Sequence, residues 1–302
     1  METKKHYSLV ALVLISCFTF GQVPELDWPI EIVSEGHGFT EGPVLATDGN
    51  IYFTDMDNDL ILLYNPATET TEVWKENSGK ANGLFIYDNY LYSCEAIGRS
   101  VVRYDLSKGP DSREILTSRF RGDSLGSPND LTIIGNILYF SEFWLDMYMN
   151  DTNKTREIFL NRVYSLLLID NSLDTIAFNF ELPNGIASSP DGEELYIVDY
   201  LPNKLYKAEV VNGRVKPLVL VTDLNNFGLA NPDGLAVSQD GHIFLALYGE
   251  SEKLVVIAPD GSVIGYLATG PLTSNCVFAE DGRTLYITAD KKLMRVVVPD
   301  RI

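Results

Sequence analysis

Residues 182–199 read LPNGIASSPDGEELYIVD, and residues 231–247 read NPDGLAVSQDGHIFLAL. In both stretches one polar residue opens a short apolar run, an Asp-Gly pair follows, and a second aliphatic and aromatic run ends the stretch. Apolar runs joined through Asp-Gly are typical of β-hairpins. The two stretches therefore predict adjacent antiparallel strands.

The same pair of segments occurs six times along the chain. The opening polar residues are Glu41, Asn82, Asn129, Asn184, Asp233 and Asn275, and the aromatic residues of the second runs are Tyr52, Tyr92, Tyr139, Tyr196, Phe244 and Tyr286. Successive aromatic residues lie 40 to 57 positions apart. A period of this length made of short β-runs predicts an all-β, six-bladed β-propeller with four antiparallel strands per blade.

The sixth repeat contains only three strand-like runs and ends at KLMRVVVP. The segment WPIEIVSE, residues 28–35, precedes the first repeat and is a candidate for the missing fourth strand. Closing the ring with strands from both chain ends would remove exposed strand edges, which promote aggregation. We therefore expect the ring to be closed by an N-terminal strand.

The overall composition fits one large domain, which we expect to span residues 22–302. The 302-residue chain is 45% hydrophobic and carries a formal net charge of −19. So acidic a chain is not attracted to nucleic acid or to anionic membranes. We expect a small molecule as its partner, and the sequence does not indicate the oligomeric state.

The N-terminus has the features of a secretory signal peptide at residues 1–21: a Lys pair at 4–5, a thirteen-residue apolar run and a small residue at the end. The run is too short to span a bilayer. These features predict export to the periplasm or the medium. An alternative is a lipoprotein anchored at Cys17, because Leu-Ile-Ser-Cys at 14–17 resembles a lipoprotein cleavage site.

Common catalytic motifs with a nucleophile or phosphate loop do not occur in the sequence. His37 and His242 have no sequence support for a catalytic triad. Cys94 and Cys276 fall in the second and sixth repeats, which are not neighbours in a six-bladed ring. We therefore expect two buried free thiols rather than a disulfide.

The six repeat positions carry only oxygen donors, and we expect them to converge at one end of the central channel. Such donors favour hard cations, above all Ca²⁺. The four residues expected to bind one divalent ion are Glu41, Asn129, Asn184 and Asp233, with Mg²⁺, Mn²⁺ or Zn²⁺ as alternatives to Ca²⁺. Asn82 and Asn275 are expected to cap strand starts by hydrogen bonds, and Asn82 is also a candidate for contacting substrate.

The third repeat carries an insert, FWLDMYMNDTNKTREIFL, at residues 143–160 between its second and third runs. Connections of this kind emerge on the face where the inner strands begin. Because the first part of the insert is apolar, we expect it to form a lid or wall over the site. Trp144 and Tyr148 are therefore candidate substrate-binding residues.

Taken together, the segments TEGPV, NIYFTD, ANGL, SPNDL, LPNGIASSPDGEELYIVD, NPDGLAVSQDGHIFLA and TSNCVFAEDGRTLYIT resemble the regucalcin/gluconolactonase (senescence marker protein) family. The resemblance runs in order from about Glu41 to Ile287. It implies a six-bladed propeller enzyme with one catalytic divalent metal, which hydrolyses lactones or related esters. The family's metal-binding Glu, its two Asn positions and its catalytic Asp correspond to Glu41, Asn129, Asn184 and Asp233.

Two segments of the sequence differ from the family's usual pattern. In the second repeat CEAIGRS lacks the family's usual His after the Glu, and in the third repeat SEFWLD replaces the usual Thr-Asp-Pro turn. Both departures flank the expected substrate face, so the resemblance leaves the identity of the lactone open.

The expected chemistry is metal-assisted hydrolysis, in which the cation polarises the lactone carbonyl and Asp233 acts as general base on water. Direct nucleophilic attack by Asp233 is the alternative. Asn129 is expected to help position the substrate ring. Two other functions stay open: an exported ligand-binding propeller with a structural metal, and a phosphotriesterase-type hydrolase.

Overall fold

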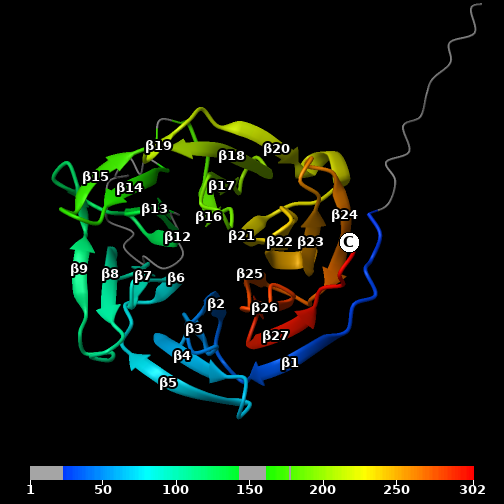
Figure 1. Cartoon of the computed structure of the whole chain (residues 1–302), viewed down its shortest axis with the longest axis horizontal. Coiled ribbons are helices and arrows are strands. Elements are labelled where there is room, and N and C mark those ends of the chain that lie inside the picture. The colour runs from blue at the N-terminus through cyan, green and yellow to red at the C-terminus, as the bar shows by residue number, and fades with distance from the viewer. Residues whose placement is uncertain (1–22, 143–160, 177) are drawn as a thin grey trace, which may run out of the picture.

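The computed structural model describes residues 23–142, 161–176 and 178–302. Within these residues the strands form six antiparallel sheets arranged as blades around a central channel, with a small two-stranded ribbon beside them (Figure 1). The predicted six-bladed β-propeller is confirmed. The segment predicted to be a signal peptide, with Cys17, and the insert, with Trp144 and Tyr148, lie outside the described residues.

The first three blades follow one another along the chain. Blade one contains β2 (Thr40–Leu45), β3 (Ile51–Asp55), β4 (Leu60–Asn65) and β5 (Thr70–Glu76). Blade two contains β6 (Ala81–Tyr87), β7 (Tyr90–Glu95), β8 (Ser100–Asp105) and β9 (Glu114–Thr117). The ribbon of β10 (Arg119–Phe120) and β11 (Asp123–Ser124) then leads to blade three, which contains β12 (Pro128–Ile134), β13 (Ile137–Glu142), β14 (Val163–Leu167) and β15 (Ser172–Thr175).

The last three blades complete the ring. Blade four contains β16 (Pro183–Ser188), β17 (Glu194–Asp199), β18 (Lys204–Val211) and β20 (Val219–Asp223), with the short β19 (Arg214–Val215) paired to the end of β18. The 3₁₀ helix η2 (Leu224–Phe227) leads to blade five, which contains β21 (Pro232–Val237), β22 (Ile243–Leu247), η3 (Gly249–Ser251), β23 (Lys253–Ile257) and β24 (Val263–Ala268). Blade six contains β25 (Thr273–Phe278), β26 (Thr284–Ala289), β27 (Lys292–Val297) and β1 (Ile30–Glu35).

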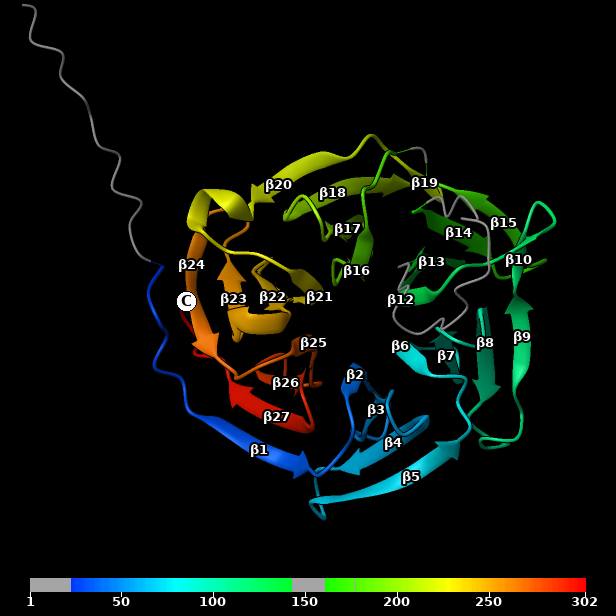
Figure 2. The same ribbon diagram turned by 180° about the vertical axis from the view of Figure 1, so that it is seen from behind.

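The N-terminal strand β1 closes the ring, as the sequence predicted. It pairs antiparallel with β27 from Ile30 opposite Val296 to Glu35 opposite Lys292, and both views show the two strands side by side (Figures 1 and 2). The preceding segment also lies along β24, where the amide of Leu26 donates to the carbonyl of Tyr266 (2.8 Å). The segment that begins the described chain therefore connects the outer edges of blades five and six.

Apolar side chains from facing sheets hold the blades together. Leu138 and Phe140 of β13, for example, share one buried cluster with Cys94 and Val101 of blade two. Burying one such aliphatic or aromatic side chain contributes roughly 1.5–3 kcal/mol. Among the described residues, the two cysteines Cys94 and Cys276 are both buried and unpaired, as predicted.

The described residues contain no helix that is both long enough and apolar enough to cross a membrane.

Candidate active site in the central channel

The six repeat positions all lie on the inner strands: Glu41 on β2, Asn82 on β6, Asn129 on β12, Asn184 on β16, Asp233 on β21 and Asn275 on β25. Each residue is buried, with an exposed fraction between 3% and 8%. Successive inner strands pack against one another around the channel (Figure 1). All six residues therefore lie buried at the starts of the inner strands, and the electrostatic interactions below link Glu41, Asn184, Asp233 and Asn275.

A β-bulge interrupts every inner strand at this position. The pairing register shifts between Glu41 and Val44 on β2 and between Pro183 and Ile186 on β16. The other four inner strands show a shift at the equivalent place. A bulge leaves a residue unpaired and changes the direction of nearby side chains. The repeated bulge frees the strand starts from regular pairing where their polar side chains meet.

Three carboxyl groups interact within this polar layer: Glu41, Asp233 and Asp130. Burial raises the pKa of Glu41 to about 8, with a smaller increase from Asp130, while the amide of Gly42 (2.8 Å) and the Asn275 side chain lower it. Burial also raises the pKa of Asp233 well above its usual range, and the charges of Glu41 and Asp130 raise it further. No Lys or Arg of the described residues contributes to these two shifts. The layer therefore lacks a positive charge that would favour its ionised form.

One acceptor in the layer has no partner among the described residues. The Asn184 Oδ1 atom is buried and makes no hydrogen bond, whereas the Asn184 side chain contributes a hydrogen bond that lowers the pKa of Asp233. A buried acceptor without a partner costs about 1–3 kcal/mol. Two carboxyl groups and a free amide oxygen together fit an oxygen-binding cation such as Ca²⁺.

Across the described residues, no three His, Cys, Asp or Glu side chains are arranged to hold a metal ion. The predicted ligand set contains only two such residues, because Asn129 and Asn184 supply amide oxygens. Its assignment therefore depends on donor chemistry and burial.

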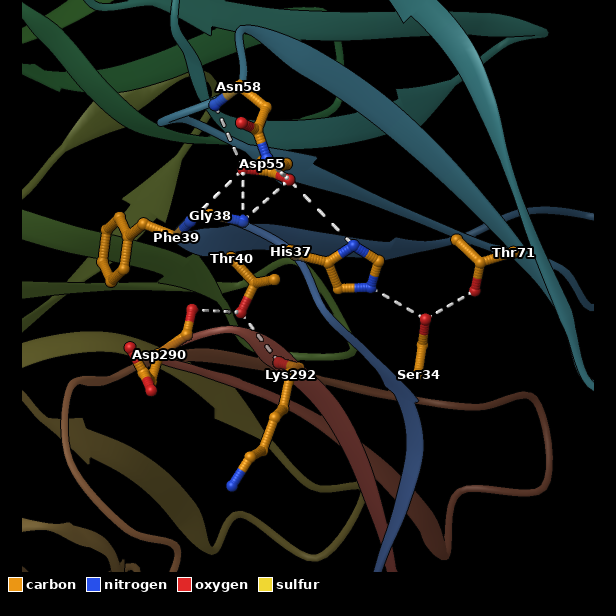
Figure 3. Close-up of polar contacts among 10 residues, drawn as sticks. All are labelled: Ser34, His37, Gly38, Phe39, Thr40, Asp55, Asn58, Thr71, Asp290 and Lys292. Carbon is orange, nitrogen blue, oxygen red and sulfur yellow. Dashed lines mark hydrogen bonds and ion pairs between the residues drawn. The ribbon is translucent and has the colours of Figure 1, made fainter.

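The carboxylates at the ends of second strands hold the backbone that leads into three of the proposed ligands. Asp55 on β3 accepts from the amides of Gly38 (3.0 Å) and Phe39 (3.2 Å), just before Glu41 (Figure 3). Asp199 on β17 accepts from the amides of Glu181 and Leu182 (2.7 Å), just before Asn184. Glu142 on β13 accepts from the amide of Gly126 ahead of Asn129. These contacts hold the backbone just before three of the inner strands, β2, β12 and β16.

His37 lies beside the first of these carboxylates but does not form a triad. Its Nε2 atom is 2.8 Å from the Ser34 hydroxyl, and its Nδ1 atom is 4.0 Å from Asp55 Oδ2 (Figure 3). The second distance is too long for a hydrogen bond. Ser34 Oγ also contacts the Thr71 hydroxyl (2.7 Å), so this group links β1 of blade six to blade one.

Asp130 could not be identified from the repeat register because it is not one of the six repeat positions. It directly follows Asn129, where four of the six repeats have glycine: Gly42, Gly83, Gly185 and Gly234. Its side chain is 6% exposed and borders a cavity of about 880 Å³ further along the channel. The sequence signal that could have identified Asp130 is a carboxylate at a position where most repeats have glycine.

The family model described as "SMP-30/Gluconolactonase/LRE-like region" matches residues 39–291. A gluconolactonase of Zymomonas mobilis subsp. mobilis is 27% identical over 301 residues, covering 90% of this chain and 82% of the relative.

Two solved structures share the fold. A gluconolactonase from Xanthomonas campestris superposes with a TM-score of 0.79 at 22% identity, covering 92% of each chain. A calcium-binding regucalcin from Agrobacterium tumefaciens superposes with a TM-score of 0.71 at 16% identity, covering 90% of this chain and 96% of the other.

Proposed function

Because the chain belongs to the SMP-30/gluconolactonase/LRE-like family, we propose that it is a lactonase, an enzyme that hydrolyses a cyclic ester in the central channel. The observation that carries the proposal is the buried layer in which Glu41, Asp233 and the unpaired Oδ1 of Asn184 meet. The gluconolactonase relative, which matches along most of its length, supports a lactone as the substrate class.

The residues proposed to hold one divalent cation are Glu41, Asn129, Asn184 and Asp233, and Ca²⁺ is the ion that their oxygen atoms suit best. The free Asn184 Oδ1 and the raised pKa values of the two carboxyl groups support this assignment. When bound, such an ion would favour the ionised carboxylates and polarise the lactone carbonyl.

The chain's own residues perform the proton transfer in this proposal. Asp233 takes a proton from water as the water oxygen bonds to the carbonyl carbon. As the bond between the carbonyl carbon and the ring oxygen breaks, Asp233 returns that proton to the ring oxygen, which leaves as the alcohol of a hydroxy acid. Asn129 and Asn82, at equivalent positions on neighbouring inner strands, position the lactone ring. Trp144 and Tyr148 of the insert are proposed to complete the substrate wall.

Direct attack by Asp233 would instead give a covalent acyl-enzyme. This acyl-enzyme is a mixed anhydride between Asp233 and the substrate acyl group. After a single turnover in ¹⁸O-labelled water, ¹⁸O in the Asp233 carboxyl group would establish direct attack, because this label enters only when water opens the anhydride at the Asp233 carbonyl carbon.

We propose that the mature protein is exported and begins after residue 21, with lipidation at Cys17 as the alternative form. Mass spectrometry of the mature N-terminus distinguishes a free residue 22 from a lipidated Cys17.

The function is tested with aldonolactones, aliphatic lactones and aryl esters, assayed for acid release with added Ca²⁺, Mg²⁺, Mn²⁺ or Zn²⁺ and with a chelator. We expect at least one lactone to be opened with a cation present and its hydrolysis to stop in the chelator. Saturable lactone binding without turnover would instead favour a ligand-binding propeller. Turnover restricted to phosphotriesters would contradict the proposed substrate class.

A further inference from the structure

Asp130 is a buried carboxylate that packs against the neighbouring inner strand β6. A Cβ atom on the neighbouring Gly83 would lie 2.4 Å from Asp130 Oδ1 and 2.7 Å from its Cα. Glycine at position 83 is therefore what makes room for the Asp130 side chain. A buried charge in so confined a place needs a specific set of partners.

Those partners come from three blades. Asp130 Oδ1 accepts from the amide of Leu131 on its own strand (2.8 Å). Its Oδ2 accepts from the amide of Ile186 on β16 (3.3 Å) and from Asn275 Nδ2 on β25 (3.3 Å). Asp130 thus joins blade three to blade four, two residues beyond Asn184, and reaches across the channel to blade six.

The orientation of the Asn275 amide is fixed by its own backbone. Asn275 Oδ1 accepts from the amide of Cys276 (2.8 Å), so the NH₂ group must point towards the carboxyl groups. The side chain also fills the space beside Gly234, where a Cβ atom would lie 2.1 Å from Asn275 Cγ. Asn275 therefore presents a donor rather than an oxygen ligand. This contact agrees with the hydrogen-bonding role expected for it from the sequence.

Asn275 also interacts with Glu41. Its side chain donates to Asp130 Oδ2 (3.3 Å) and also lowers the pKa of the Glu41 carboxyl group. The amide of Gly42 already holds Glu41 Oε2 (2.8 Å). The Asn275 donor, itself held by Asp130, then limits the remaining freedom of the Glu41 carboxylate.

We propose that Asp130 and Asn275 form a positioning pair that fixes the Glu41 carboxylate, and through Ile186 the start of β16, without either residue binding substrate or cation. This inference rests on the proposed function, since it assigns Glu41 and Asn184 to the cation site. Hydrogen-bond partners of metal-binding carboxylates commonly change metal affinity or activity by about 10- to 100-fold when they are replaced.

The test compares Asp130→Asn, Asn275→Ala and the double variant with wild type. Glu95→Gln is the matched control, because Glu95 is also a buried carboxylate (2% exposed) but pairs with Arg113 in blade two. Calorimetry gives the Ca²⁺ dissociation constant, circular dichroism gives Tm, and steady-state assays give kcat and KM for a lactone that wild type opens.

We expect each single channel variant to weaken Ca²⁺ binding about 10- to 100-fold and to lower kcat more than it raises KM. The double variant should bind Ca²⁺ no more than about threefold more weakly than the single variant with the lower Ca²⁺ affinity, because both residues act through one contact. Glu95→Gln should lower Tm while its Ca²⁺ affinity stays within about twofold of wild type. If Asp130→Asn does not fold, the Ca²⁺ affinity of Asn275→Ala compared with that of Glu95→Gln tests the positioning role.

Three results would overturn the positioning pair. They are a wild-type Ca²⁺ affinity in both single channel variants, losses of Ca²⁺ affinity that add up in the double variant, and an equal loss of Ca²⁺ affinity in Glu95→Gln. If the wild type binds Ca²⁺ but opens no lactone, the proposed function is contradicted. The comparison of Ca²⁺ affinities still tests the positioning pair. If the wild type opens lactones without a cation, kcat replaces Ca²⁺ affinity as the measured quantity. The losses of kcat in the two single variants should then again be non-additive in the double variant. A wild type with neither activity nor Ca²⁺ binding overturns both.

Discussion

Asp233 on β21 and Glu41 on β2 interact within the channel from blades five and one, and neither is more than 6% exposed. Burial raises the pKa of Asp233, and the charge of Glu41 raises it further. Two carboxyl groups in this arrangement either keep protons or bind a cation.

Calcium should stabilise the folded protein. A ligand that binds only the native state contributes about 2.7 kcal/mol at about 100 times its Kd. We expect Tm to rise by several degrees on adding Ca²⁺ to chelator-treated protein, and elemental analysis to find one divalent ion per chain. Glu41→Gln should lose most of the effect. A wild type without bound metal whose Tm ignores Ca²⁺ would contradict the cation site.

The metal-free protein should lose stability as pH rises from 5 to 8. The pKa of Glu41 is raised to about 8 and that of Asp233 is raised as well, so the native state holds protons that the unfolded chain releases above its ordinary carboxyl pKa. Stability supplied by the protonated forms is complete at low pH and is lost through this window. Added Ca²⁺ should therefore raise Tm more at pH 8 than at pH 5.

Glu41→Gln is the control for this pH dependence. Burial lowers the pKa of His37, which costs stability as pH falls below about 6.5 and so opposes the carboxyl effect. The difference in Tm between wild type and Glu41→Gln, measured in chelator from pH 5 to 8, isolates the carboxyl contribution. A difference that stays constant over this range would show that Glu41 has no raised pKa.

Deleting residues 24–35 should severely lower Tm or cause aggregation. The deletion removes β1 and leaves the edge of β27 unpaired. Glu31→Ala is the control, since its ion pair with Arg295 is solvent-exposed and should contribute about 1 kcal/mol or less. A truncated chain that melts like the full mature protein would rule out a structural need for ring closure.

Much of the fold could be predicted because each blade repeats a local pattern. Asp-Gly turns and alternating runs identify the hairpins, and the missing run in the sixth repeat indicates that an N-terminal strand must complete it. The common register also places Glu41 and Asp233 on one layer, although they are far apart in sequence. All of these conclusions depend only on spacing.

The contacts of Asp130 could not be predicted in this way. Its role depends on Ile186 and Asn275, which come near it only when blades four and six are in place. Within the described part of the chain, the contact between Leu26 and Tyr266 and the short β10–β11 ribbon have no counterpart in the other repeats. Such features depend on tertiary packing rather than on periodicity.

The insert 143–160 should determine which lactone is preferred. Replacing Trp144 and Tyr148 with Ala should change the ranking of lactones in kcat/KM and leave Ca²⁺ affinity nearly unchanged, because loops on a rigid scaffold commonly set specificity. A kinetic screen of the double variant checks this. An unchanged ranking would show that the insert does not contact substrate. Loss of the metal would show that the insert contributes to the cation site.

The most direct test of the account is the rate of acid release from the best lactone by wild type and by Asp233→Asn, at saturating Ca²⁺ and in a pH-stat. We predict a loss of about 100-fold or more in kcat for every lactone, since loss of a general base commonly costs about 10²–10⁴-fold. Circular dichroism should show that the variant is folded, because the amide replaces a carboxyl group of the same shape. A folded Asp233→Asn variant that turns over lactones at the wild-type rate would contradict the proposed active site.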